Sequence, residues 1–404
     1  MPLPVPNAVA ALQPELTAWR RDLHAHPEVG FELPRTAALV AAKLRAWGLD
    51  EVVEGIGRSG VVGVIHGHDG PAQDAARRIL LRADMDALPM REATGLPHAS
   101  TRPEAFHGCG HDGHTTMLLG AAKILAETRA FSGTAVLVFQ PAEEGDRGAK
   151  AMLDDGLLAR WPVRAAFGLH NVPGMAVGAM GTRPGPMLAY SDRFRITLRG
   201  RGGHAARPHL ADDPILGAAA IVQGLQALVA RRRDPTVPAV ISVTRFEAGT
   251  ADNVIPPTAE LWGTLRTLDP DLVAPMIEGM RRVAETLAAA HGLSVEAELG
   301  LDADPALVND PAATAFATQV MRETAGEDAV DPAVPAEMGG EDFAWFAQAV
   351  PACFALIGNG ASAPLHHPEY DFDDAVAPHG VAWWRRLVER ALPQRPDDPT
   401  APGR

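Results

Sequence analysis

The sequence predicts an α/β protein: a main domain with a mostly parallel sheet flanked by helices, and an inserted α+β domain of ferredoxin-like order. Three observations predict this. Apolar strand-like runs alternate with helical patterns in the first half, which is typical of a parallel sheet covered on both faces. Residues of metal-binding type follow several of these runs, at the sheet edge where ligands sit. From about Gly185 the order becomes strand, helix, strand, strand, helix, strand.

Composition limits the function. The 404 residues suffice for two or three domains, and 47% of them are hydrophobic, which is ordinary for a soluble globular protein. A net charge of −14 argues against binding nucleic acid or anionic lipid by bulk attraction. Cys109 and Cys353 are too few for a disulfide framework, and neither a signal peptide nor an apolar run of about 18 residues is recognisable. We expect a cytoplasmic protein with a small-molecule partner and no nucleic-acid or membrane partner.

The first half of the chain is expected to supply most of the parallel sheet. Amphipathic spacing predicts helices over residues 14–24, 34–47 and 115–127. Continuous apolar runs predict strands over residues 61–65, 79–82, 134–139 and 165–169. Polar residues that could bind a metal follow three of these strands: Asp84, Asp86, Glu143, Glu144 and His170. One such residue could arise by chance in any α/β protein, whereas three strand ends together indicate a site.

The second half contains the inserted domain and the return to the first. The insertion is predicted over 186–297, and the main domain over 1–185 and 298–392. The insertion's strands are expected over 194–198, 239–246, 259–265 and 293–299, with helices over 214–231 and 272–291. The returning chain is expected to form helices over 311–324 and 376–392 and a strand over 352–357. The tail 393–404, rich in Pro, Asp and Arg, is expected to be disordered.

The stretch from His107 to His114 is the strongest chemical signal. It reads His-Gly-Cys-Gly-His-Asp-Gly-His, so eight residues hold three imidazoles, a thiol and a carboxylate, spaced by glycines. Glycine frees the backbone to aim several side chains at one point. Thiolate and imidazole suit zinc, nickel, cobalt and related ions. A surface loop rich in histidine by chance is the alternative, but we favour a metal or catalytic role for this combination.

Glu143 and Glu144 form a second signal, because they are adjacent and follow a buried strand and a proline. A pair of neighbouring glutamates is usually a solvated surface pair. Beside the Cys/His stretch, however, one carboxylate can bind metal while the other accepts a proton from water and passes it to a leaving amine. A metal pair would polarise the substrate carbonyl and lower the pKa of water.

These motifs resemble those of the M20 metallopeptidases, in particular the amidohydrolase branch of hippurate hydrolases, N-acyl-amino-acid amidohydrolases and auxin-conjugate hydrolases. The resemblance lies in segments 82–89, 107–114, 140–145, 168–170, 202–209 and 339–343. It implies that the general base is Glu143. It implies metal ligands at Cys109, His111, Glu144, His170 and His366. His366 is preferred to His367 because Leu365 precedes it, as the branch's motif requires, and Asp84 stands where other branches begin a His-x-Asp metal motif.

The resemblance also assigns roles in the inserted domain. His204, after two glycines, would reach the metal site of a partner subunit and stabilise the oxyanion, and Asn253 would help bind substrate. This implies a homodimer, or a homotetramer, assembled through the insertion. The alternative is an ordinary loop histidine and turn asparagine. Asp86 and Asp112 are expected to orient a ligand imidazole, unless they only cap loops.

The expected function is metal-dependent hydrolysis of the amide bond in N-acyl amino acids, hippurate-like or N-acetylated, to a carboxylic acid and a free amino acid. Two divalent ions per subunit are expected, with Mn²⁺ preferred and Ni²⁺, Co²⁺ or Zn²⁺ as alternatives. A dipeptidase or aminoacylase-type peptidase of the same family would share this machinery. A non-catalytic binding protein for acyl amino acids would not need Glu143. The sequence leaves open the acyl group, the amino acid, the physiological metal and the ligand that bridges the two ions.

Overall fold

The computed structural model describes residues 2–72 and 74–394, and its contacts divide the chain into two units. The first unit contains Met1–Gly185, Val308–Pro335 and Trp345–Arg404. The second contains Pro186–Leu307 and Ala336–Ala344. Most of the tail predicted to be disordered, residues 395–404, lies outside the described residues.

The first unit is built on one mixed sheet whose central strands are parallel, as predicted. Along the sheet its strands are β1 (Glu51–Ile56), β2 (Gly60–His66), β4 (Thr134–Gln140), β3 (Arg78–Asp84), β5 (Ala165–Val172), β16 (Ala352–Gly358), β6 (Met180–Gly181) and β15 (Val330–Asp331). The four strands from β4 to β16 run parallel, and the register pairs Asp84 with Gln140 and His170 with Leu356. Their carboxyl ends therefore meet at one edge of the sheet, where ligands bind in folds of this class.

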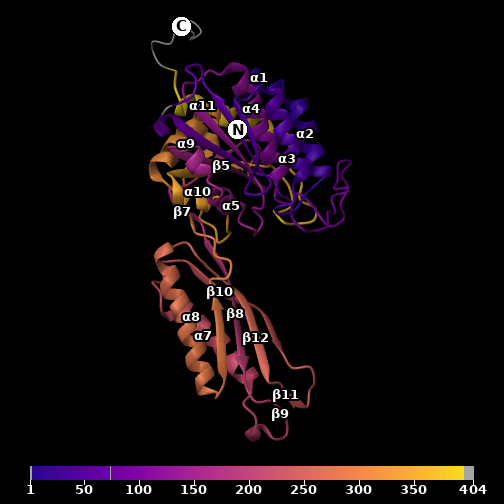
Figure 1. Ribbon diagram of the computed structural model, residues 1–404, viewed down its shortest axis with the longest axis vertical. Coiled ribbons are helices and arrows are strands. Elements are labelled where there is room, and N and C mark those ends of the chain that lie inside the picture. The colour runs from indigo at the N-terminus through magenta and orange to yellow at the C-terminus, as the bar shows by residue number, and fades with distance from the viewer. Residues whose placement is uncertain (1, 73, 395–404) are drawn as a thin grey trace. The chain divides into compact units, whose positions relative to one another are not determined.

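Helices lie on both faces of this sheet (Figure 1). The longer ones are α2 (Gln13–Ala25), α3 (Pro34–Ala46), α4 (His111–Thr128), α9 (Pro311–Ala325) and α11 (Ala377–Ala391), and the short ones are α1 (Asn7–Ala10), α5 (Gly148–Asp154), α6 (Leu157–Arg160) and α10 (Ala344–Ala349). Two glycines of β2 show the two faces. A side chain at Gly63 would meet Leu44 of α3, whereas one at Gly60 would meet Met152 of α5. An odd separation along a strand turns side chains to opposite faces.

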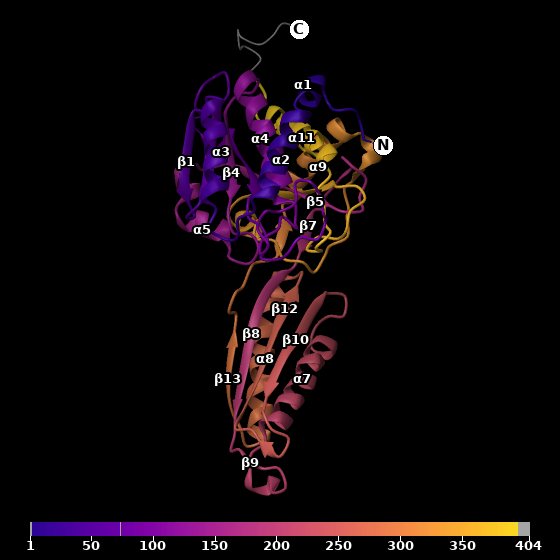
Figure 2. The ribbon, with the colours of Figure 1, turned by 90° about the vertical axis from the view of Figure 1, so that its right-hand side faces the viewer.

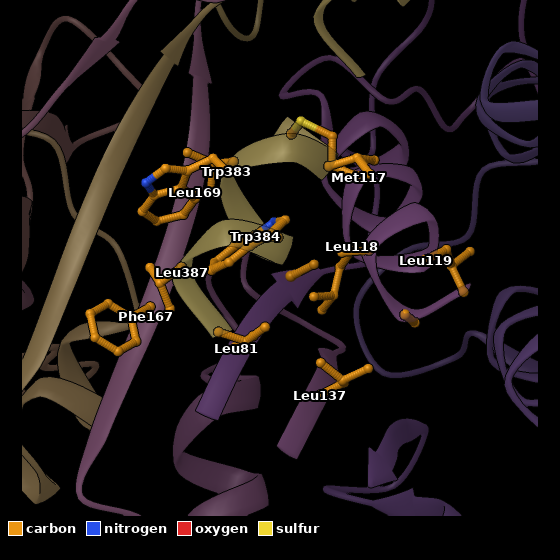
Figure 3. Packing of buried hydrophobic residues seen from close by; sticks show 14 of the residues in the cluster. Leu81, Met117, Leu118, Leu119, Leu137, Phe167, Leu169, Trp383, Trp384 and Leu387 are labelled. Atoms are coloured by element: carbon orange, nitrogen blue, oxygen red, sulfur yellow. The ribbon is translucent and has the colours of Figure 1, made fainter. Parts of the chain in front are cut away.

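The core between α4, α11 and the sheet is closely packed. Figure 3 shows Trp383, Trp384 and Leu387 of α11 beside Leu118 of α4 and Phe167 of β5, and all five are nearly or fully buried. Almost all of α4 is buried, including its charged first turn. His111, one of the expected metal ligands, is the first residue of α4, so the packing of this helix fixes the position of that histidine.

The second unit has the predicted ferredoxin-like order. Its elements are β8 (Tyr190–Arg199), α7 (Pro214–Arg231), β10 (Ala239–Ala248), β12 (Thr258–Thr267), α8 (Pro270–Ala290) and β13 (Ser294–Leu299). The sheet order is β10-β12-β8-β13, all antiparallel, with α7 and α8 along one face (Figure 2). Phe194, Ile196 and Leu198 of β8 point inward as predicted. By length and composition α7 could span a membrane, but a helix that packs on a sheet passes the same test.

The structure differs from the sequence analysis at three points. The edge strand β1 has no counterpart among the predicted strands, because its residues are half exposed and it gains its conformation by pairing with β2. The helix expected from Thr115 begins at His111, so that histidine is helical rather than in the loop. The predicted end of the insertion at residue 297 falls inside β13, whose pairing continues to Leu299 opposite Phe194. Short elements complete the fold: β7 (Gly185–Leu188), β9 (Gly203–His204), β11 (Val254–Ile255) and β14 (Leu307–Asn309).

We predict that Gly120→Ala destabilises the protein although alanine favours helices by about 1 kcal/mol. A Cβ at Gly120 of α4 would lie 2.5 Å from Val381 Cγ2 and 2.7 Å from Leu16 Cδ2. Overpacking of this kind costs about 1–3 kcal/mol. Urea unfolding would measure the change. In a Val381→Ala background the penalty should shrink, and an equal penalty in both backgrounds would show that the α4–α11 contact is not its cause.

Candidate metal centre

The first ligand group lies where α4 begins. Gly110, just before the helix, has φ of +89°, a conformation that favours glycine. This turn places Cys109 and His111 on either side of it, both buried. Cys109 Sγ lies 3.4 Å from Nε2 of His170 in β5. The Nδ1 atom of His170 lies 2.8 Å from the main-chain oxygen of Asn171, so Nδ1–H donates there and Nε2 is the nitrogen turned toward Cys109.

The glutamate pair is held in a strained turn after β4. Ala142, fully buried, has φ of +55°, which is uncommon for a residue with a side chain. After this turn the main-chain N–H groups of Glu143 and Glu144 both donate to the carboxylate of Asp86, at 3.0 and 3.1 Å. Asp86 therefore holds the main chain of this loop, and the glutamate side chains take no part in these two hydrogen bonds.

His366 approaches from a loop after β16. Its Nε2 lies 3.2 Å from Oε1 of Glu144. Its φ is +63°, and its N–H donates to the main-chain oxygen of Gly108, next to Cys109. A left-handed histidine held in this way is the kind of local strain found at functional sites. Its neighbour His367, by contrast, is exposed and accepts a hydrogen bond from the N–H of Glu369.

The five side chains expected to bind metal form two overlapping groups. Cys109, His111 and His170 make one, and Cys109, Glu144 and His366 make the other, with the candidate ligand atoms of each group within 4.8 Å of one another. The shared member is Cys109. Glu143 lies in a further group with His111 and Glu144, at 3.9 Å from Nε2 of His111. The geometry thus gathers side chains from α4, from β5 and from three loops, which carry Cys109, the glutamate pair and His366, around one small volume.

The electrostatics of this volume fit divalent cations. The carboxylates of Asp84, Asp86, Glu143 and Glu144 all lie within 3.4–3.9 Å of a ring nitrogen of buried His111. Burial opposes the charged ring, but Asp84, Asp86 and Glu144 raise the pKa of His111 to about 10. Among the described residues neither of its ring nitrogens makes a hydrogen bond. A bound cation would replace one ring proton of His111 and bind that nitrogen, and the other nitrogen would keep its proton.

The thiol gives the same indication. Burial, with the nearby charges of Glu144 and Glu143, raises the pKa of Cys109 well above its usual value. A protonated thiol is a poor ligand, so the thiolate needs a cation beside it. Burial lowers the pKa of His170 to about 4, which leaves its Nε2 neutral and able to bind. The donor set therefore fits a metal centre of imidazole, thiolate and carboxylate.

Asp84 and His114, to which the sequence analysis assigns no role, lie next to this centre and form a candidate group with His111. Asp84 Oδ1 lies 2.6 Å from His114 Nδ1, and Arg82 Nη1 donates to Asp84 Oδ2 at 2.6 Å. All three residues are buried. Burial opposes ionisation, but the positive charges of His111 and Arg82 lower the pKa of Asp84 well below its usual value. Asp84 is thus a buried anion, and its two carboxylate oxygens make hydrogen bonds with His114 and Arg82.

The prediction that Asp112 orients a ligand imidazole differs from the structure, in which Asp112 contacts His24 instead. Its Oδ2 lies 2.8 Å from Nδ1 of His24 in α2, because the first turn of α4 directs Asp112 away from the ligands. Asp86, the other predicted orienting residue, lies 3.4 Å from His111 Nδ1 and also holds the glutamate loop. Sequence patterns gave no indication of His24, which lies about 90 residues from its partner.

His204 and Asn253 belong to the second unit. The short strands β9 and β11 pair His204 with Val254, and the main-chain oxygen of Asn253 accepts the N–H of Ala205. Both residues are exposed. The structure therefore brings these two residues together in one hairpin-like tip, and their roles remain predictions.

Sequence reasoning missed Asn171. It is fully buried and contacts both Cys109 and His114. The one available signal was its place directly after His170 at the end of a strand. Its partner Tyr370 is also fully buried and comes from the loop that carries His366.

Comparisons with known proteins agree with this geometry. The model of peptidase family M20/M25/M40 matches residues 80–390. A hippurate hydrolase of Campylobacter jejuni is 38% identical over 381 residues, covering 94% of this chain and 97% of that protein. An N-acetylcysteine deacetylase of Bacillus subtilis is 39% identical, covering 90% and 93%. The crystal structure of Bacillus subtilis YXEP, described as a dinuclear metal-binding peptidase of the M20 family, is 35% identical with a TM-score of 0.81, covering 95% and 99%.

We predict that His24→Gln removes a pH dependence of stability. Burial opposes protonation of His24, but the hydrogen bond and charge of Asp112 raise its pKa to about 9, against 6.5 for the unperturbed ring. A raised pKa stabilises the fold below pH 6.5, and this contribution, on the order of 3 kcal/mol, is lost as pH rises through 9. Chemical unfolding from pH 6 to 10 would measure the slope.

The matched control is His379→Gln. Burial lowers the pKa of His379, so above about pH 7.5 its ring is neutral in both the folded and the unfolded chain and contributes almost no slope. If His24→Gln and His379→Gln retain the same slope as the parent protein, the His24–Asp112 pair is not its source.

Proposed function

The chain belongs to peptidase family M20/M25/M40, and from this premise we propose that it hydrolyses N-acyl amino acids to a carboxylic acid and a free amino acid. Metal-dependent amide hydrolysis follows from the family and from the named relatives. The finer substrate class is supported by those relatives, since the printed names of two of them are hippurate hydrolase and N-acetylcysteine deacetylase. The compounds in these two names, hippurate and N-acetylcysteine, are both amides with a free amino-acid carboxylate.

One observation carries the proposal: two overlapping ligand groups share Cys109, and a further carboxylate, Glu143, lies beside them. Five ligands divided between two ions leave coordination positions for water and substrate. Cys109, as the member common to both groups, would help to hold the ions together with His111, Glu144, His170 and His366. Mn²⁺ is our preferred pair, with Ni²⁺, Co²⁺ and Zn²⁺ as alternatives. Such ions would supply a Lewis acid for the carbonyl and make water more acidic.

The chain's own side chains then perform the proton transfers. We assign Glu143 as the general base, which accepts a proton from the attacking water and delivers it to the departing amine nitrogen. Its carboxylate is 11% exposed, so it can be reached from solvent while it stays near the ligands. Asp86 fixes the main chain of Glu143 and so keeps the base in place.

A dipeptidase or aminoacylase-type peptidase is the second candidate, since it would use the same ligands. Peptides and N-acyl amino acids differ in the charge beside the scissile bond, because a dipeptide carries a free amino group there. Parallel kcat/KM measurements on hippurate, N-acetyl amino acids and dipeptides decide between the two. A clear preference for dipeptides would overturn the proposed substrate class.

We further propose that the active protein is a cytoplasmic homodimer, or a tetramer built from such dimers, assembled through the second unit. β10 is an edge strand of its sheet and exposes Val240 and Phe246 at 39% and 43%. The adjacent α7 exposes Ile215 and Leu216 at 39% and 59%. An unpaired sheet edge beside an apolar helix suits a two-fold contact. His204 would stabilise the oxyanion in the partner's site, and Asn253 would contact the substrate.

We predict that Glu143→Gln keeps the metal content but loses nearly all turnover, because an amide cannot accept the proton from water. General acid–base catalysis typically contributes about 10²–10⁴-fold, so we expect kcat to fall by at least about 10²-fold. Metal analysis and rates on hippurate, measured on one preparation, test this. A near-normal rate would remove Glu143 from the mechanism.

We predict that His204→Ala lowers kcat by roughly 10²–10³-fold with intact metal content, as expected for loss of an oxyanion donor. The arrangement across two chains is testable by mixing inactive His204→Ala chains with inactive Glu143→Gln chains. In a mixed dimer one site has both defects and the other has neither, so activity should return. Native mass spectrometry confirms subunit exchange, and exchange without any activity would place His204 within its own site or outside catalysis.

A further inference from the structure

Asn171 makes hydrogen bonds to two proposed ligands that come from different parts of the chain, Cys109 before α4 and His170 of β5. Its side-chain Nδ2 donates to the main-chain oxygen of Cys109 at 2.7 Å. Its main-chain oxygen accepts from Nδ1 of His170 at 2.8 Å. One buried asparagine therefore holds two expected ligands: it contacts the main chain of Cys109 and the ring of His170.

The directions of these hydrogen bonds are fixed by the groups involved. The carbonyl of Cys109 can only accept, so the amide nitrogen of Asn171, and not its oxygen, must face it. The Asn171 oxygen Oδ1 accepts from the Tyr370 hydroxyl at 2.8 Å. A flipped amide would place Oδ1 against two acceptors, the carbonyl of Cys109 and Nε2 of His114, so these groups fix the orientation in which Oδ1 accepts from Tyr370.

His114 fixes the main chain of Asn171 in the same way. Its Nε2 lies 3.0 Å from the main-chain N–H of Asn171, so it must accept, and Nδ1 must then carry the proton that points to Asp84. His114 is therefore a neutral ring with one defined tautomer.

The packing leaves little space for the Cys109 turn to move. A Cβ at Gly110 would lie 2.3 Å from Nδ2 of Asn171 and 2.5 Å from the hydroxyl of Tyr370. The backbone at Gly110 therefore rests directly on the Asn171–Tyr370 pair. This close approach requires glycine in addition to the positive φ, and it shows that the pair supports the turn from which Cys109 projects.

We propose that Asn171, held by Tyr370 and His114, is a positioning residue that keeps Cys109 and His170 facing one shared cation. It contacts neither the substrate nor the reacting atoms. This inference rests on the proposed ligand set, since it assigns a purpose to an arrangement of Cys109 and His170. Residues that orient ligands from behind typically change metal affinity by roughly 10–100-fold when removed.

The test uses Co²⁺ alone as the probe on metal-depleted full-length protein. Cobalt bound to a thiolate gives a charge-transfer absorption, so the titration reports affinity and the Cys109 bond together. We expect Asn171→Ala to bind cobalt roughly 10–100-fold more weakly, with a smaller thiolate absorption per ion bound. Tyr370→Phe keeps the ring and removes only the hydroxyl, so it should act in the same direction with a smaller effect.

The matched control is Asn359→Ala. Asn359 is also fully buried directly after a parallel strand, and its amide donates to Asp371 and accepts from Asp373, away from Cys109. It should lower the unfolding temperature of the metal-free protein, as Asn171→Ala does, and leave the cobalt titration as in the parent. If Asn171→Ala does not fold, Tyr370→Phe against Asn359→Ala still decides.

Outcomes for the inference and for the ligand set can be separated by Cys109→Ser. If that variant retains the thiolate absorption, Cys109 is not a ligand and the proposed function loses its ligand set. If Cys109→Ser abolishes the absorption while Asn171→Ala and Tyr370→Phe titrate like the parent, only the positioning role is refuted. Equal weakening by Asn359→Ala would mean that any loss of core polarity disturbs the site, and it would also refute the role.

Discussion

The structure of the first unit depends on how it tolerates negative charge at one edge of its sheet. Asp84, Asp86, Glu143 and Glu144 lie within 3.4–3.9 Å of one histidine, together with a buried thiol. Such a concentration is unfavourable in a poorly solvated interior unless opposite charge is supplied. Arg82 supplies part of it, through Asp84. The proposed cations would supply the rest, so the same charges that disfavour the metal-free centre would favour metal binding.

The main chain around this edge is shaped for the same end. Gly110, Ala142 and His366 all have positive φ, and each lies within one or two residues of a proposed ligand or base, or is one itself. Only one of the three is a glycine, so the other two conformations persist because neighbouring contacts hold them. The hydrogen bonds of Asp86 to the glutamate loop and of Gly108 to His366 are such contacts. Support of this kind keeps side chains from several loops close to one another.

The second unit follows a different logic. Its alternating burial, two amphipathic helices and antiparallel order arise from periodicity that is visible along the chain. It covers one face of its sheet with helices and leaves the other face to charged pairs such as Arg195 with Glu260. The two residues for which we propose a chemical role, His204 and Asn253, lie together at its β9–β11 tip. This separation explains why the sequence predicted its fold order correctly while its functional contacts are proposals.

The sequence by itself determined the fold class, the order of the inserted elements and the residues that gather at the centre. Hydrophobic periods of two and of about 3.6 residues are local properties, and glycine-spaced Cys and His residues are readable as a string. Only the tertiary structure decided that Asp112 pairs with His24, that Asp84 joins Arg82 to His114, and that Asn171 joins Cys109 to His170. The pairings of Asp112 with His24, of Asp84 with His114 and of Asn171 with Cys109 connect residues 88, 30 and 62 positions apart. A short polar side chain can find such a partner only once packed helices and strands have fixed which groups lie within about 3 Å.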